Sequence, residues 1–393
     1  MSIASRERAA ARATLGTVAR EWTRIGVTGF GGPPAHIALL RQLVVQRMGW
    51  MDARSFEDAN AACGLLPGPS STQLAILCAY RVAGAAGAIV GGLGFIVPSV
   101  ALILPLSALF LAQAPPRWVL GAGAGAGAAV AAVAVHAARG LVGPSLKRAH
   151  DDRDRMVRWS AYLVAGVAAA VLIGPYLVIV LLGSGLVELV LRRRSRGRVP
   201  GNPKALGAFV PASVSSGGIG ALAWTALKVG ALSFGGGFVI VPLMQSDAVH
   251  VYHWMTDAQF LNAVAIGQIT PGPVVATVAA VGYAAQGLAG GVLAAVVAFA
   301  PSFAFILLGG GRFERLRANP NPQAFLDGAG PAAIGAILGA AITLATALQE
   351  GWQFGVLAAA AVALLIGGRG VVQTLLGAGV IGVVVALAGG PLP

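Results

Sequence analysis

Charge is scarce in this chain. Only 10% of its 393 residues are Asp, Glu, Lys or Arg, whereas 57% are hydrophobic, and the mean hydropathy is +0.80. Soluble domains carry about 25% charged residues, so this composition excludes an ordinary soluble enzyme or binding module. Apolar runs long enough to cross a hydrocarbon core of roughly 30 Å recur along the chain. Because these runs are continuous rather than alternating, the sequence predicts an all-α polytopic membrane protein and not a membrane barrel.

Cysteine and metal-binding patterns are equally sparse. The two cysteines, Cys63 and Cys78, lie in apolar surroundings and are expected to be small buried side chains rather than a disulfide or metal site. No iron–sulfur, haem or zinc spacing occurs, so the sequence predicts neither a cofactor nor a metal. Scattered serines, His36 and Asp58 have no catalytic spacing, which favours a protein that is not an enzyme over an intramembrane enzyme.

Acidic residues are about half as numerous as basic ones, 14 against 27, which gives a net charge of +13. The basic residues lie in connecting segments, as expected for loops that stay on the cytoplasmic side of a membrane. We therefore expect the lipid bilayer as a partner and no nucleic acid. Residues 1–16 lack the apolar centre of a secretory signal and are interpreted as a basic cytoplasmic tail.

An internal duplication covers nearly the whole chain. Phe30-Gly31-Gly32 returns as Phe234-Gly235-Gly236, and Pro67-Gly68-Pro69 returns as Pro271-Gly272-Pro273, both at an offset of 204 residues. Beyond the second motif the offset is 203, as in Tyr80 with Tyr283 and Ser99 with Ser302. The sequence predicts a first transporter repeat over residues 17–191, a basic linker over 192–215 and a second repeat over 216–393.

The positive charges of equivalent loops have opposite distributions in the two halves. The loop at 112–118 holds one basic residue, and its counterpart holds Arg312, Arg315 and Arg317. The loop at 147–158 holds five, and its counterpart near Gln349-Glu350 holds none. This contrast predicts inverted repeats, with 112–118 outside and 143–158 inside. If Gly174-Pro175 splits the long run at 159–191, we expect about 10–13 membrane segments.

Four glycine- or proline-rich breaks interrupt apolar runs, at Gly31-Gly32-Pro33, at 235–237 and at the two Pro-Gly-Pro motifs. Unsatisfied backbone groups cost several kcal/mol in hydrocarbon, so such breaks persist where protein encloses them. A helix N-terminus carries about half a positive charge and free amides, which suit an anion. The four breaks predict broken helices that converge on a small-anion site near the midplane, the alternative being simple kinks.

Each half also carries one cation at the same repeat position. Arg24 precedes Phe30 by six residues, and Lys228 precedes Phe234 by six. An intramembrane charge indicates a functional site unless the side chain extends to the interface. Two buried cations and several helix N-termini would suit a dianion.

The predicted substrate-binding residues combine these cations, the breaks and the neighbouring hydroxyl and amide side chains. They are Arg24, Gly31, Gly32, Gly68, Ser70, Ser71, Thr72, Gln73, Lys228, Gly235, Gly236, Gln268, Thr270, Gly272 and Thr277. His36 and Asp58 are candidates for proton coupling. The alternatives are a structural histidine and an ion pair between Asp58 and Arg24 or Arg54.

These motifs together resemble the chromate ion transporter (CHR) family, in its long two-domain ChrA type. The resemblance rests on the paired Phe-Gly-Gly and Pro-Gly-Pro motifs and on Lys228-Val229-Gly230, and it covers about residues 17–390. It implies a multi-pass carrier in the inner (plasma) membrane that expels chromate with the proton gradient and so confers chromate resistance.

Several alternatives remain open beside this expectation. Sulfate, another tetrahedral dianion, is an alternative substrate, and an anion channel is an alternative mechanism to alternating access. The first half departs from the second in having Pro33-Pro34 where the second has Gly237-Phe238, so the two half-sites are expected to differ. The oligomeric state stays open, with a homodimer as one alternative.

Overall fold

The computed structural model describes residues 13–112, 114–147, 149, 152–195, 217–233, 238–309 and 320–393, which contain helices and no strands. In the first half the elements are α2 (Leu15–Thr28), α3 (Pro33–Arg41), the π-helical η1 (Gln42–Arg47), α4 (Ala53–Cys63), α5 (Ser70–Phe110), α6 (Arg117–Lys147), α7 (Arg153–Leu172), η2 (Gly174–Tyr176) and α8 (Leu177–Ser195). In the second half they are α9 (Ile219–Leu232), α10 (Ile240–Gln245), the π-helical η4 (Ser246–Val251), α11 (Asp257–Ile269), η5 (Val274–Thr277), α12 (Val278–Gly309), α14 (Pro320–Thr346), α15 (Gly351–Leu365) and α16 (Val371–Leu387).

The order of elements confirms the duplication. Even the π-helical turns η1 and η4 fall at equivalent positions, and the long run at 159–191 divides at Gly174 as predicted. Among the described residues five helices are long and apolar enough to cross a membrane, namely α5, α6, α7, the helix Val274–Gly309 and α14. The protein is therefore a polytopic, all-α membrane protein. Cys63 and Cys78 are both buried, as expected.

Helices α5 and α12 each fold back on themselves at a glycine. Gly84 and Gly287 have φ angles of +69° and +61°, which glycine adopts without a steric penalty. A Cβ built on Gly87 would lie only 2.6 Å from the carbonyl oxygen of Ala79, whereas eight residues span about 12 Å in a straight helix. Helix α5 therefore consists of a short arm, residues 70–82, and a long arm, residues 85–110. In the second half, η5 and the start of α12 form the short arm, residues 274–285, and the rest of α12 forms the long arm, residues 288–309.

Two of the predicted breaks, at Gly31-Gly32 and at Pro67-Gly68-Pro69, lie at the tips of helical hairpins, whereas the break at 235–237 lies outside the described residues. Arg81, at the end of the short arm, donates a hydrogen bond of 2.9 Å to the carbonyl oxygen of Ser55, near the start of α4. Helix α4 and the short arm are thus antiparallel, and the Pro-Gly-Pro motif at 67–69 forms the tip between them. Similarly, Glu21 on α2 pairs with Arg47 on η1, so α2 and α3 are antiparallel with Gly31-Gly32 at their tip.

The long arms of α5 and α12 cross in opposite directions. Gly92 contacts the ring of Phe303, and Leu104 contacts Gly291. Because these arms are equivalent parts of the two repeats, membrane helices of the same repeat position run in opposite directions. This arrangement is the inverted-repeat architecture predicted from the loop charges.

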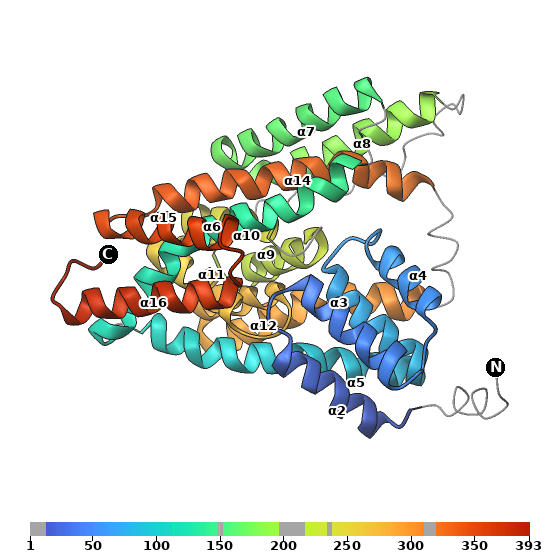
Figure 1. The fold of residues 1–393 in the computed structure, drawn as a ribbon, viewed down its shortest axis with the longest axis horizontal. Coiled ribbons are helices and arrows are strands. Elements are labelled where there is room, and N and C mark those ends of the chain that lie inside the picture. Colours follow the sequence, from blue (N-terminus) through green and yellow to red (C-terminus); the bar gives the residue numbers. More distant parts are fainter. Residues whose placement is uncertain are drawn as a thin grey trace.

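The two halves exchange helices with each other. Helix α6 packs against α15 and α16 of the second half, and α14 packs against α7 and α8 of the first (Figure 1). Backbones approach closely at these contacts, as at Gly121 with Gly382 and Gly166 with Ala332, because small residues allow helices to meet. The repeats are therefore interleaved and are not two separately packed bodies.

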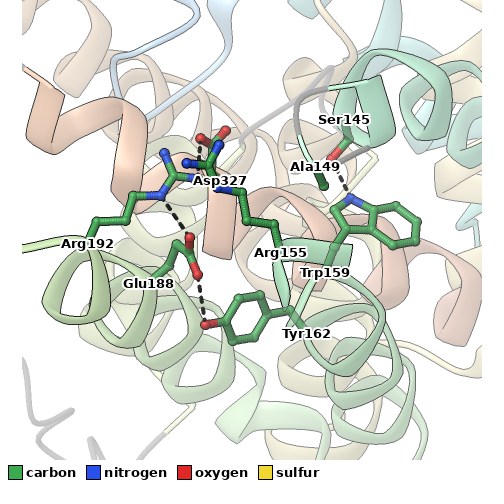
Figure 2. A pocket seen from close by; sticks show the side chains of 8 residues that line it. All are labelled: Ser145, Ala149, Arg155, Trp159, Tyr162, Glu188, Arg192 and Asp327. Carbon is green, nitrogen blue, oxygen red and sulfur yellow. Dashed lines mark hydrogen bonds and ion pairs between the residues drawn. The ribbon is translucent and has the colours of Figure 1, made fainter. Parts of the chain in front are cut away.

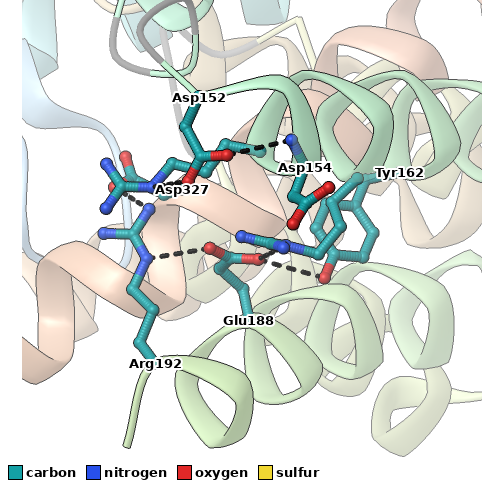
Figure 3. A network of polar contacts seen from close by, with 8 residues as sticks. Asp152, Asp154, Tyr162, Glu188, Arg192 and Asp327 are labelled. Carbon is teal, nitrogen blue, oxygen red and sulfur yellow. Dashed lines mark hydrogen bonds and ion pairs between the residues drawn. The ribbon is translucent and has the colours of Figure 1, made fainter. Parts of the chain in front are cut away.

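A polar cluster joins α14 of the second half to α7 and α8 of the first half. Glu188 on α8 accepts a hydrogen bond of 2.9 Å from Arg158. It also accepts one of 2.8 Å from Arg192, which pairs with Asp327 of α14 at 2.9 Å (Figure 2). Figure 3 shows the same group with Tyr162, whose hydroxyl lies 3.3 Å from Glu188. The cavity beside it measures about 10 Å³, room for about one water molecule, so this cluster joins helices and is too small for an oxyanion.

Candidate functional site

Each Pro-Gly-Pro tip docks on the opposite half of the chain. The amide of Gly272 donates a hydrogen bond of 3.0 Å to the carbonyl oxygen of Gly29, and a Cβ on Gly272 would lie 2.9 Å from that of Ser99. In the reciprocal contact, a Cβ on Gly68 would lie 3.1 Å from the carbonyl oxygen of Gly230 and 3.7 Å from the hydroxyl of Ser302. Ser99 and Ser302 are repeat equivalents, so the tips are related by an approximate two-fold.

A cavity of about 410 Å³, called the central cavity below, lies between the tips and α6. It falls within the size range of small-ligand sites. Gly31 and Gly32 line it from the first half, and Gly272 lines it from the second. Its polar side chains come from three elements: Ser70, His136, Gln268 and Thr270. The remaining lining is mostly apolar, including Phe238 and Val371.

Unused hydrogen-bond donors face this cavity. Gln268 is only 9% exposed, and its side-chain Nε2 has no hydrogen-bond partner among the described residues. Ser70 is the first residue of the short arm of α5, whose first amides have no intrahelical acceptor. Buried polar groups are nearly always satisfied, so an unpaired buried amide calls for a partner that the protein itself does not supply. Together these donors suit an acceptor-rich anion.

The tip at Gly31-Gly32 contributes shape more than donors. Both glycines have positive φ, +100° and +72°, and α3 begins immediately after them at Pro33-Pro34. Two prolines at the start of the helix remove two of the amides that would otherwise be free. The first half-site is therefore poorer in donors at this tip, which agrees with the expected inequality of the two halves.

The two predicted cations have different environments, and neither lines the central cavity. Arg24 is exposed on the outer face of α2, so the prediction that it is buried is wrong; its side chain extends from the surface, where long cations are stable. Lys228 is buried as predicted, but its Nζ lies 2.5 Å from the Asp247 carboxylate on η4. Asp247 also accepts a hydrogen bond of 2.7 Å from Thr225. The charge of Lys228 is thus already balanced within the protein.

The predicted residues around the short arms mostly stabilise the tips. The Gln73 side chain donates a hydrogen bond of 2.7 Å to the carbonyl oxygen of Pro67, and Thr277 donates one of 2.7 Å to that of Val274. Thr72 is fully buried, and its hydroxyl has no partner among the described residues. Gly68, Ser71, Thr72, Gln73 and Thr277 lie outside the described lining of the central cavity. Gly235 and Gly236 lie outside the residues that the structure describes.

The two proton-coupling candidates differ in their burial. His36 is fully buried on α3, with Nε2 2.9 Å from the carbonyl oxygen of Gly29 and Nδ1 3.3 Å from the Ser71 hydroxyl. It therefore joins the first tip to the start of the short arm. Asp58 is half-buried on α4 and lies outside the lining of the central cavity.

Two residues that sequence reasoning missed are His136 and Asp247. His136 faces the central cavity from α6, and its Nδ1 is buried without a hydrogen-bond partner among the described residues. Asp247 is 2% exposed. Both are ionisable residues inside apolar segments, a signal that indicates function by default and that could have found them.

Helices of membrane-spanning length, inverted and interleaved repeats and a cavity with polar side chains from both halves define a polytopic membrane protein of the transporter class. The family model described as chromate transporter matches residues 16–189 and 220–383. A chromate transport protein of Cupriavidus metallidurans is 33% identical over 365 residues, which cover 90% of this chain and 88% of the relative. One of Pseudomonas aeruginosa is 31% identical over 340 residues, 83% of this chain and 80% of the relative. No solved structure matches. The chain belongs to the chromate transporter family.

Proposed function

We propose that this protein is a secondary carrier that exports chromate across the inner (plasma) membrane and thereby confers chromate resistance. The observation that carries the proposal is the central cavity, where unpaired donors from both halves meet. Chromate presents four acceptor oxygens to Ser70, Gln268 and the first amides of the α5 short arm. The names of the relatives from Cupriavidus metallidurans and Pseudomonas aeruginosa support chromate as the transported anion.

Sulfate is the second candidate substrate because it has the same charge and tetrahedral shape. Counterflow of labelled chromate and labelled sulfate in liposomes tests both, since a carrier loaded with unlabelled substrate inside concentrates the label transiently. We expect labelled chromate to accumulate transiently inside the liposomes, and unlabelled chromate added outside should abolish this accumulation. A conductive leak without counterflow would indicate a channel, and an absence of both would contradict the proposal.

In this architecture, alternating access cannot arise from one whole repeat moving against the other. The exchange of α6 and α14 between the halves prevents the repeats from separating as rigid bodies. We infer that the hairpins and the crossed long arms of α5 and α12 move together against two layers, one formed by α6, α15 and α16 and the other by α14, α7 and α8.

His36 is the group that we propose for proton coupling, with Asp58 as the alternative. If the neutral ring donates Nε2–H to Gly29, its Nδ1 accepts from the Ser71 hydroxyl. Protonation would turn Nδ1 into a donor and change the position of the short arm beside the cavity. We expect His36→Gln to retain chromate counterflow and lose accumulation driven by a pH gradient. Unchanged accumulation driven by the pH gradient in His36→Gln would contradict this role. If Asp58→Asn loses this accumulation and His36→Gln does not, Asp58 is the proton-coupling group.

A further inference from the structure

A second cavity, called the vestibule below, lies between α6, α11 and α15. It measures about 500 Å³, and its polar side chains are uncharged. They are Thr256, Gln259, Asn262, Gln349 and Gln353, of which Gln353 already donates a hydrogen bond of 3.2 Å to the carbonyl oxygen of Ala124. The vestibule therefore has the same kind of lining as the central cavity, amides and a hydroxyl on a largely apolar wall.

The two cavities lie in a row along one helix interface. On α6, Gly123 and Gly127 line the vestibule, whereas His136 lines the central cavity. On α11, Asn262 lines the vestibule and Gln268 lines the central cavity. Both helices thus pass from one cavity to the other in the same direction, and the interface between α6 and α11 connects them.

Only a short apolar segment separates the cavities. On α6 it comprises residues 128–132, which are all buried and are alanine except for one valine. On α11 it comprises residues 263–266, which are also buried. At 1.5 Å per residue, the six steps from Gly127 to Val133 cover about 9 Å. Side chains this small leave little to displace when the helices shift.

The glycines of α6 make room for an amide at this interface. A Cβ on Gly123 would lie 2.6 Å from the side-chain oxygen of Asn262, so no other residue fits there without moving that amide. Asn262 is itself only 9% exposed. The run of alternating glycine and alanine on α6 therefore does more than permit close packing, because at Gly123 and Gly127 it shapes a polar cavity.

We propose that the vestibule is a second binding site for the transported tetrahedral oxyanion and the outer end of its route. The buried segment at 128–132 and 263–266 is the gate between the vestibule and the central cavity. The identity of the ligand rests on the proposed function, whereas the gated route does not. Uncharged donors bind a dianion weakly, which suits a transfer site that the ion must leave. The loop at 112–118, expected outside, adjoins the vestibule through Pro115.

Sided thiol labelling tests the gated route without reference to any substrate. In a chain with Cys63 and Cys78 replaced by alanine, Asn262→Cys, Gln268→Cys and Ala132→Cys are treated in oriented vesicles with an impermeant, charged thiol reagent. Without substrate and with the gate closed, we expect Asn262→Cys to react from the outer face only, Gln268→Cys to react much faster from the inner face than from the outer face, and Ala132→Cys to react from neither. Val296→Cys, at a position 63% exposed within the long arm of α12 that we assign to lipid, is the unreactive control.

Without substrate, reaction of Gln268→Cys from the outer face as fast as that of Asn262→Cys would overturn the gate, and no reaction of Asn262→Cys from either face would overturn the vestibule. For the ligand, we expect Asn262→Leu to lower chromate counterflow at least tenfold while equilibrium chromate binding stays within twofold, and Asn262→Gln to restore most of the rate. Equal losses of binding and counterflow would indicate a structural role and contradict the proposal. If the wild-type chain shows no chromate counterflow, the proposed function fails, while the labelling pattern still decides the route.

Discussion

Gly272 occupies a position that only glycine fits. Its φ is +99°, and an added Cβ would lie 2.9 Å from the Cβ of Ser99. A left-handed conformation costs an ordinary residue roughly 1–2 kcal/mol, and overpacking costs about 1–3 kcal/mol more. We therefore expect Gly272→Ala to lower the melting temperature of the purified protein clearly and to reduce counterflow, because the tip would move away from the central cavity.

Gly330→Ala is the matched control for this substitution. Gly330 lies within α14, and nothing lies within 4 Å of its built Cβ. Alanine is preferred over glycine in a helix by about 1 kcal/mol, so this variant should be as stable as the wild type or more stable. Similar melting temperatures for the two variants would contradict the packing described for the Gly272 tip.

The buried pair of Lys228 and Asp247 gives a second prediction at this scale. Removal of one partner of a buried ion pair typically lowers the free energy of unfolding by about 3–5 kcal/mol, because the other charge is left uncompensated. For Lys228→Met we expect a loss of about 3 kcal/mol. The double variant Lys228→Met with Asp247→Leu should regain most of the lost stability. Melting curves of the three proteins in detergent measure this directly, and no recovery in the double variant would contradict the pairing.

Counterflow by the double variant separates a structural role of Lys228 from a role in binding. Because Lys228 is balanced by Asp247 and lies outside the described cavity lining, we expect a refolded double variant to carry chromate at a rate within a few fold of the wild type. Loss of transport in a stable double variant would indicate that Lys228 takes part in substrate binding. The first half holds a pair of reversed polarity, with the acid Glu21 on α2 and the base Arg47 on η1.

At the scale of elements, the exchange of helices between the repeats is open to a direct test. A Cβ on Gly379 of α16 would lie 3.9 Å from the Cβ of Ala126 on α6. Disulfides have Cβ separations of about 3.5–4.5 Å. The pair Ala126→Cys and Gly379→Cys, in the background without the native cysteines, should therefore form a disulfide on mild oxidation.

Cleavage between the halves makes this disulfide visible. With a protease site inserted in the segment between residues 195 and 217, the oxidised pair should remain one band on a denaturing, non-reducing gel after cleavage and separate on reduction. Each single-cysteine variant should separate without reduction. Separation of the oxidised double variant would show that α6 and α16 are not neighbours and would contradict the interleaved fold.

At the scale of the whole molecule, three features of the sequence were sufficient: composition predicted the class, the repeated motifs predicted the duplication, and the loop charges predicted the inversion. The two Pro-Gly-Pro motifs predicted interior helix starts, and Ser70 and Gln268 do line one cavity. The exchange of α6 and α14 could not be predicted, because a sequence repeat does not show whether a helix packs against helices of its own half or of the other half. Burial of Arg24 was predicted wrongly since a repeat position fixes the place along a helix and not the face, and its exposure follows from packing.

The two missed residues show the same limit. The sequence marks Asp247 and His136 as ionisable residues in apolar segments, but the partner of Asp247 follows from the contact of α9 with η4, and the cavity that His136 lines follows from the position of α6. The hairpin form of the breaks also depended on long-range contacts, such as that between Arg81 and Ser55. Local sequence thus predicted the donors, and tertiary structure decided which of them share a cavity.

The central claim is that unpaired donors in the central cavity bind the transported oxyanion. Equilibrium binding of labelled chromate to the purified wild type, Gln268→Leu and Gln373→Leu tests it most directly, Gln373 being an exposed glutamine of α16. A hydrogen bond to a charged group contributes about 1.5–3 kcal/mol, so Gln268→Leu should weaken binding at least tenfold. Gln373→Leu should bind as the wild type does. Equal affinity of Gln268→Leu and the wild type would contradict the claim.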